Sequence, residues 1–98
     1  MLDITPERLE LCKRYMIIDH DEDDMLISSL LAASDEYLEG AGIKRDVSPY
    51  QYDLVANAMT LEAYETRGLT KMVEIAQSPA IRQRIVQLKL RSNYGGNA

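Results

Sequence analysis

Each of the three prolines in this sequence follows a serine or a threonine, and each such pair is a signal that starts an α-helix. The pairs are Thr5-Pro6, Ser48-Pro49 and Ser78-Pro79. A Ser or Thr side chain can cap the free N–H groups of a first helical turn, and proline fits that turn because its missing N–H is not needed there. The pairs therefore predict helices that begin near residues 6, 49 and 79.

A fourth helix is predicted after the acidic run at residues 19–24, because carboxylates cap and favour the positive end of a helix dipole. We expect this helix to run to about Glu39 and to stop at Gly40 and Gly42. The spacing predicts that one side is apolar (Leu26, Ile27, Leu30, Leu31, Tyr37, Leu38) and that the other is polar (Ser28, Asp35, Glu36, Glu39).

The other helix ends are less sharply marked. The first helix is expected to end near Arg14, the helix after Pro49 near Arg67, and the last helix to be short. Residues 69–77 are compatible with an extended arm or with a helical turn. Residues 93–98 are expected to form a flexible end.

The helix after Pro49 is predicted to be the central one, because it is apolar around most of its circumference. Its clear polar stripe is short (Asp53, Asn57, Thr60). The chain of 98 residues is expected to be a single domain, residues 1–98, with a mainly α fold of about four helices. Its expected core residues come from the second and third helices (Leu26, Leu30, Tyr37, Leu54, Ala58, Leu61, Tyr64).

Charge is distributed unevenly along the chain. Residues 1–65 carry 15 acidic and 5 basic side chains, a net charge of −10, whereas residues 66–98 carry 1 acidic and 6 basic side chains, a net charge of +5. The basic end could meet the acidic part of a neighbouring copy, head to tail, or fold back on its own acidic part. An acidic body argues against an independent nucleic-acid binder, which needs a basic face.

The acidic run is also the natural candidate for a metal site. A calcium loop of the EF-hand type that started at Asp19 would have Asp24 where glycine is required and Leu30 where a bidentate glutamate is required. We therefore predict helix capping and a solvated acidic turn, with no metal. His20 has no companion for acid–base chemistry, and Cys12 lies on an apolar helix face as a small hydrophobe. No catalytic residue and no cofactor site is predicted, so we expect a protein that is not an enzyme.

Four basic residues near the C-terminus are the candidate contacts with a neighbouring subunit or another partner: Arg82, Arg84, Lys89 and Arg91. Helical spacing does not gather all four on one stripe, and an ordinary solvated face is the alternative. No apolar run approaches the roughly 20 residues that span a bilayer. The first residues also lack the pattern of a signal peptide, so cytoplasmic synthesis without a membrane partner is expected.

Three stretches, in order along the chain, resemble the small head–tail connector (adaptor) proteins of tailed bacteriophages and prophages, a family also described as of possible DNA-packaging role. The first stretch is residues 11–27, with a short helix, a connector ending in Asp19, an acidic turn and then Leu26-Ile27. The second is residues 58–68, where Tyr64-Glu65-Thr66-Arg67 is similar to the Tyr-Glu-x-Arg end of the family's third helix. The third is residues 79–91, where Lys89 stands in place of arginine and Pro79-Ala80-Ile81 replaces the family's usual Pro-x-Gly-Val.

The resemblance implies a structural virion protein that forms a ring, typically of about a dozen subunits, beneath the portal. Such a ring extends the DNA channel and joins head to tail. The implied partners are copies of the chain itself, the portal protein, the next tail-completion protein and passing double-stranded DNA, which is not bound sequence-specifically. The implied location is the virion, and the host cytoplasm during assembly. The rival hypotheses are a small helical regulator that binds a protein or DNA, and a metal-dependent enzyme built on residues 19–24.

Overall fold

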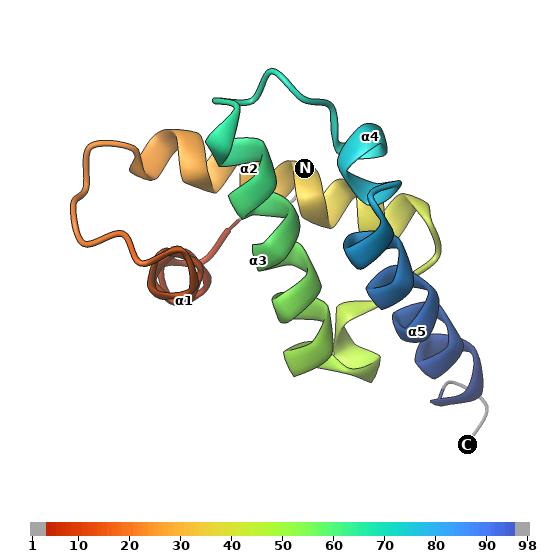
Figure 1. Cartoon of the computed structure of the whole chain (residues 1–98). Helices are drawn as coiled ribbons and strands as arrows, with labels where there is room; N and C mark the ends of the chain where they lie inside the picture. The colour runs from red at the N-terminus through yellow and green to blue at the C-terminus, as the bar shows by residue number, and fades with distance from the viewer. Residues whose placement is uncertain (1–3, 96–98) are drawn as a thin grey trace.

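The computed structural model of the chain describes residues 4–95, and side chains as far as residue 91 (Figure 1). In this part of the chain there are five α-helices, one short 3-10 helix and no strand, so the predicted mainly α fold is confirmed. The elements are α1 (Pro6–Met16), α2 (Asp24–Gly40), η1 (Arg45–Val47), α3 (Pro49–Glu65), α4 (Met72–Ala76) and α5 (Pro79–Gly95).

The three helices predicted from the Ser/Thr-Pro pairs are confirmed as α1, α3 and α5. At α1 the Thr5 hydroxyl accepts a hydrogen bond from the backbone N–H of Arg8 at 3.2 Å, as a capping residue should. The side chain of Ser48 makes no such bond, and there the first turn is held only by the backbone, with the N–H of Tyr52 donating to the Ser48 carbonyl at 2.9 Å.

α3 is the central helix, as predicted, because α1, α2, η1, α4 and α5 all pack against it (Figure 1). Its predicted polar stripe points into the protein, where Thr60 is fully buried and Asn57 nearly so. The Thr60 hydroxyl donates to the Ala56 carbonyl at 2.8 Å and lies 3.2 Å from the Ser34 hydroxyl of α2. The hydroxyls of Thr60 and Ser34 thus each have a partner, which offsets the cost of burying them.

The predicted core residues are partly wrong. Of the seven predicted core residues only Ala58 is buried, and Leu54 is 43% exposed. Leu26, Leu30, Tyr37, Leu61 and Tyr64 are half-buried, and Leu30, Tyr37, Leu61 and Tyr64 pack against the core. On α2 the buried side includes Ile27, Leu31 and Leu38 from the predicted apolar side, and also Ser34 and Asp35. Asp35, predicted on the polar side, is buried because Arg8 from α1 neutralises it, so the buried side extends beyond the predicted apolar side.

The C-terminal third is more helical than predicted. Residues 69–77 contain the one-turn helix α4, with Ile75 and Ala76 buried, and so are not an extended arm. α5 has 17 residues instead of being short, and α4 brings the number of α-helices to five. The flexible end predicted from residue 93 is helical at residues 93–95, and residues 96–98 lie outside the described residues.

α1 ends in a backbone conformation that its sequence does not favour. Ile17 has φ of 58°, the left-handed region, where its N–H donates to the Arg14 carbonyl and the next N–H donates to the Lys13 carbonyl. This is a Schellman motif, in which glycine is usual because it has no Cβ. At the equivalent position after α2 the chain does have glycine, Gly42 with φ of 85°. A β-branched residue in this conformation is strained.

Replacing Ile17 with glycine is expected to raise the free energy of unfolding by about 0.5–1 kcal/mol, because relief of the strain exceeds the entropy that glycine adds to the unfolded chain. Ile17 is 91% exposed, so little buried surface is lost. The matched control is Gly42→Ala, which places a Cβ in the same kind of motif and is expected to destabilise the fold. Urea unfolding measures both. A less stable Ile17→Gly variant would show that the strain is absent.

Candidate functional site

Four charged side chains join α1, α2, η1 and α3 in one cluster. Arg8 holds Asp35 with both arms of its guanidinium, one of them at 3.0 Å, and lies 3.4 Å from Asp53. Arg45 binds Asp53 through two hydrogen bonds of 2.8 Å. Burial alone would lower the pKa of Arg8, but the hydrogen bond to Asp35 and the charges of Asp35 and Asp53 outweigh it and raise that pKa. With all four charges paired, the cluster serves to fix the helices.

The acidic run at residues 19–24 is only partly solvated, which corrects the prediction of a solvated turn. The ammonium of Lys13, itself buried on α1, binds Asp21 at 2.7 Å and Asp24 at 2.8 Å. Its hydrogen bonds to Asp21 and then Asp24 raise the pKa of Lys13. Asp23 is the N-cap residue of α2, but its side chain makes no capping hydrogen bond and instead accepts hydrogen bonds from the Tyr64 hydroxyl and from Arg67 at 2.9 Å. The run therefore attaches α2 to α1 and α3.

The pKa of Asp23 lies below its ordinary value of 3.8, because the hydrogen bond from Tyr64 and then that from Arg67 favour the carboxylate. Its contribution to stability is therefore complete above pH about 4 and is lost as the pH falls through the lower folded value. An NMR titration of the Asp23 carboxyl should give a midpoint below 3.8. In Tyr64→Phe, which lacks the first hydrogen bond, the midpoint should rise. A wild-type midpoint at or above 3.8 would contradict this assignment.

The other residues with possible chemistry are placed as follows. Cys12 is fully buried in the core, and burial raises the pKa of its thiol to about 11. His20 is exposed in the turn. Among the described residues no three His, Cys, Asp or Glu side chains are grouped so that they could hold a metal ion.

α5 divides the four candidate contact residues into two pairs. Seven residues make about two helical turns, so Arg82 and Lys89 share one stripe, and Arg84 and Arg91 share another that is rotated by about 160–200°. All four are exposed, and within the described residues none of them takes part in an ion pair. The alternative in which the basic end neutralises its own acidic part therefore does not describe these four residues.

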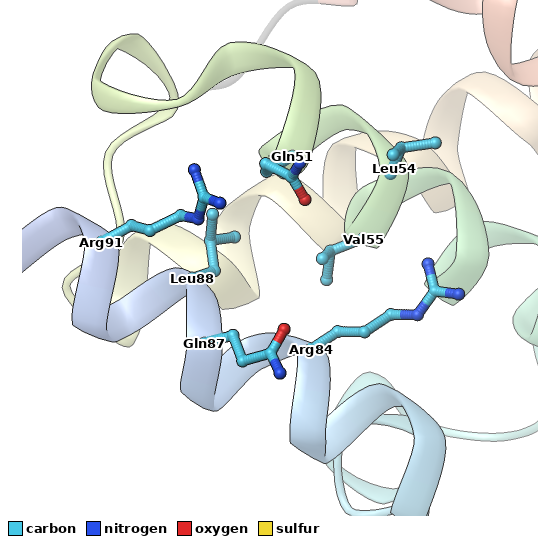
Figure 2. A pocket seen from close by; sticks show the side chains of 7 residues that line it. All are labelled: Gln51, Leu54, Val55, Arg84, Gln87, Leu88 and Arg91. Carbon is cyan, nitrogen blue, oxygen red and sulfur yellow. The ribbon is translucent and has the colours of Figure 1, made fainter.

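Arg84 and Arg91 lie along a hollow between α3 and α5, which we call the α3–α5 groove (Figure 2). Its volume is about 310 Å³. Figure 2 shows the two arginines reaching from α5 at opposite ends of the hollow, with Gln87 and Leu88 between them. The groove thus combines two free guanidinium groups, two amides and an apolar floor, and is lined by Gln51, Leu54, Val55, Arg84, Gln87, Leu88 and Arg91.

Sequence reasoning missed the groove, although part of its signal is in the sequence. Arg84, Gln87, Leu88 and Arg91 follow the spacing i, i+3, i+4, i+7 of one helix face. The α3 side, with Gln51 and Leu54, is not predictable in this way, because it depends on how α5 crosses α3. Such a set of groups is suited to bind a segment that carries both carboxylates and apolar side chains.

Within residues 4–95 no helix has the combination of length and apolar character that crossing a bilayer requires. A scan against protein-family models, a search of curated proteins and a search of solved structures each find no match to this chain.

Proposed function

We propose that the protein is a head–tail connector, a structural virion component that assembles into a ring beneath the portal, extends the DNA channel and joins head to tail. In this proposal it acts by assembly and catalyses no reaction. Its partners are copies of itself, the portal protein, the next tail-completion protein and passing double-stranded DNA, which it contacts without reading the sequence. It acts in the virion and, during assembly, in the host cytoplasm.

The observation that carries the proposal is the unpaired basic charge gathered on α5. α5 carries four exposed basic side chains without an ion pair in the described part of the chain, and it lies on the side of the molecule opposite the α1–α2 connection (Figure 1). Exposed acidic residues outside every ion pair of the described part of the chain lie on several elements, and two of them, Asp19 and Glu22, lie in that connection. Two different complementary surfaces on one molecule favour head-to-tail contacts, which close into rings when the rotation between subunits allows it. The sequence resemblance to connector proteins points the same way.

Co-sedimentation with portal rings of a tailed phage tests this function. The chain is expected to pellet with the rings in a saturable amount and to stay in the supernatant without them. Saturation at one copy or a few copies per portal subunit is the result that a connector requires. Failure to pellet at any concentration or salt level would refute the proposal.

A small regulator that binds DNA remains the second candidate, because α5 is longer than the sequence indicated. A helix of 17 residues with Arg82, Arg84, Lys89 and Arg91 exposed is long enough to lie along a DNA groove. Binding of double-stranded DNA, followed by fluorescence anisotropy over a range of salt concentrations, separates the two functions. The regulator requires affinity that falls linearly with the logarithm of the salt concentration and is lost when the four residues become Gln. The connector requires no sequence-dependent binding.

A further inference from the structure

The α3–α5 groove carries positive charge that is not neutralised by an ion pair, and apolar surface lies beside it. Arg84 and Arg91 have no ion-pair partner within the described residues, and Leu54 at the edge of the groove is 43% exposed. The two arginines are seven residues apart, which places their backbones about 10 Å apart along the helix axis. A partner for this groove must therefore carry two negative groups at a similar spacing, and apolar side chains next to them.

The chain itself carries such a segment. Residues 17–25, which we call the acidic loop and which include the first two residues of α2, contain Asp19 and Glu22, both exposed and outside every ion pair of the described residues. The loop also contains two of the most exposed apolar side chains of the molecule, Ile17 at 91% and Met25 at 87%. Three residues of chain span at most about 10 Å, so Asp19 and Glu22 are within reach of the long side chains of both arginines.

The loop of one molecule cannot fill the groove of the same molecule. Figure 1 shows the α1–α2 connection and α5 on opposite sides of α3, and the molecule is elongated, with extents of 43 × 26 × 24 Å. Internal ion pairs, moreover, hold the loop in place, from Lys13 to Asp21 and Asp24 and from Arg67 to Asp23. The loop is thus pre-organised, with its free carboxylates and apolar side chains presented outward. Pre-organisation lowers the entropy lost on binding.

We propose that the acidic loop of one copy docks into the α3–α5 groove of the next copy, with Asp19 and Glu22 facing Arg84 and Arg91 and the exposed apolar side chains covering the groove floor. The contact is heterologous, so each copy has a loop to give and a groove to fill, and a chain of such contacts propagates or closes into a ring. This arrangement explains why a β-branched residue stands at the strained position 17, since the Ile17 side chain takes part in the contact between copies. The closure of these contacts into a ring rests on the proposed function. The contact between two copies does not depend on it.

A charge-swap experiment tests the contact, with self-association measured by sedimentation velocity over a concentration series. The loop variant is Asp19→Lys/Glu22→Lys, and the groove variant is Arg84→Glu/Arg91→Glu. Each alone is expected to associate about tenfold or more weakly than the wild type. Mixing the two variants should restore association, because each positive loop then meets a negative groove and each negative loop meets a positive groove.

The matched control is Glu7→Lys/Glu10→Lys, which makes the same change of charge on the exposed outer face of α1 and should leave association unchanged. Ile17→Gly should associate more weakly although its fold is expected to be more stable, a combination that loss of folding cannot produce. Circular dichroism checks that every variant keeps its helices.

Three results would overturn the proposed contact: a wild type that stays monomeric at every concentration, variants that associate like the wild type, or a mixture that does not regain association. The outcomes separate this contact from the proposed function. Copies that associate through the loop and groove but never bind portal rings would refute the connector function alone. Copies that join portal rings while the charge swap has no effect would refute the contact alone.

Discussion

Replacement of Arg8 with alanine is expected to lower the free energy of unfolding by about 3 kcal/mol, because it leaves the carboxylate of Asp35 buried without its partner. The side chains of Arg8 and Asp35 are only 12% and 7% exposed, and Arg8 contacts Asp35 with both arms of its guanidinium. The value stands at the low end for a broken buried pair, because Arg45 remains nearby and water can reach part of the gap. For a domain of this size, about 3 kcal/mol is a large share of a total stability of about 5–15 kcal/mol.

The control for Arg8 is a double replacement, Arg8→Met/Asp35→Leu, which removes both charges together. Apolar residues of similar volume often replace a buried ion pair without loss of stability, so this variant should be more stable than Arg8→Ala. Chemical denaturation of the single and double variants measures the coupling. A loss below about 1 kcal/mol for Arg8→Ala would mean that the pair is effectively solvent-exposed.

Leu31→Ala is expected to cost about 2–5 kcal/mol, through lost burial and the cavity that remains. Leu31 is fully buried on the side of α2 that faces the core, whereas the neighbouring Leu30 is half-buried. The matched variant Leu30→Ala removes the same atoms and should cost less than Leu31→Ala. Urea unfolding of the pair tests the orientation of α2 directly. A larger loss for Leu30→Ala would contradict this orientation of α2, because it would make Leu30 the more buried of the two.

The positions of the helix starts were predictable because they depend on local chemistry. Each Ser/Thr-Pro pair precedes a helix. Within an α-helix, proline is well tolerated only in the first turn, and this preference does not depend on the rest of the chain. The sequence does not distinguish a helical turn from an extended arm at α4, because five residues carry too little periodic pattern. The sequence predicts a short α5, whereas the helix continues to Gly95, since no clear stop signal precedes that residue.

The orientation of the helices was harder to predict than their existence. Asp35 looks like a surface residue in a sequence pattern, and only the approach of Arg8, 27 residues earlier, makes its burial possible. Lys13 is buried for the same reason, with Asp21 and Asp24 around its ammonium. Long-range charge pairs of this kind leave little local signal, so the pattern of α2 predicts the burial of Ile27, Leu31 and Leu38 but not that of Asp35.

The candidate contact residues were predictable as a set but not as a surface. The excess of basic residues after residue 66 identified Arg82, Arg84, Lys89 and Arg91. Their division into two stripes follows from helix geometry, but the groove beside Arg84 and Arg91 exists only because α3 contributes its other wall. The exposed Ile17 was not predictable, because its left-handed conformation is set by how α1 ends and not by its own preference.

Electron microscopy of portal rings saturated with the chain tests the central claim most directly, namely that this protein works through the surfaces it offers to its own copies and to adjoining virion parts. The account predicts one closed ring of the chain, coaxial with the portal channel, in which each copy touches two neighbours through two different surfaces. Portal rings that remain bare, or that carry isolated copies without contacts between them, would contradict it.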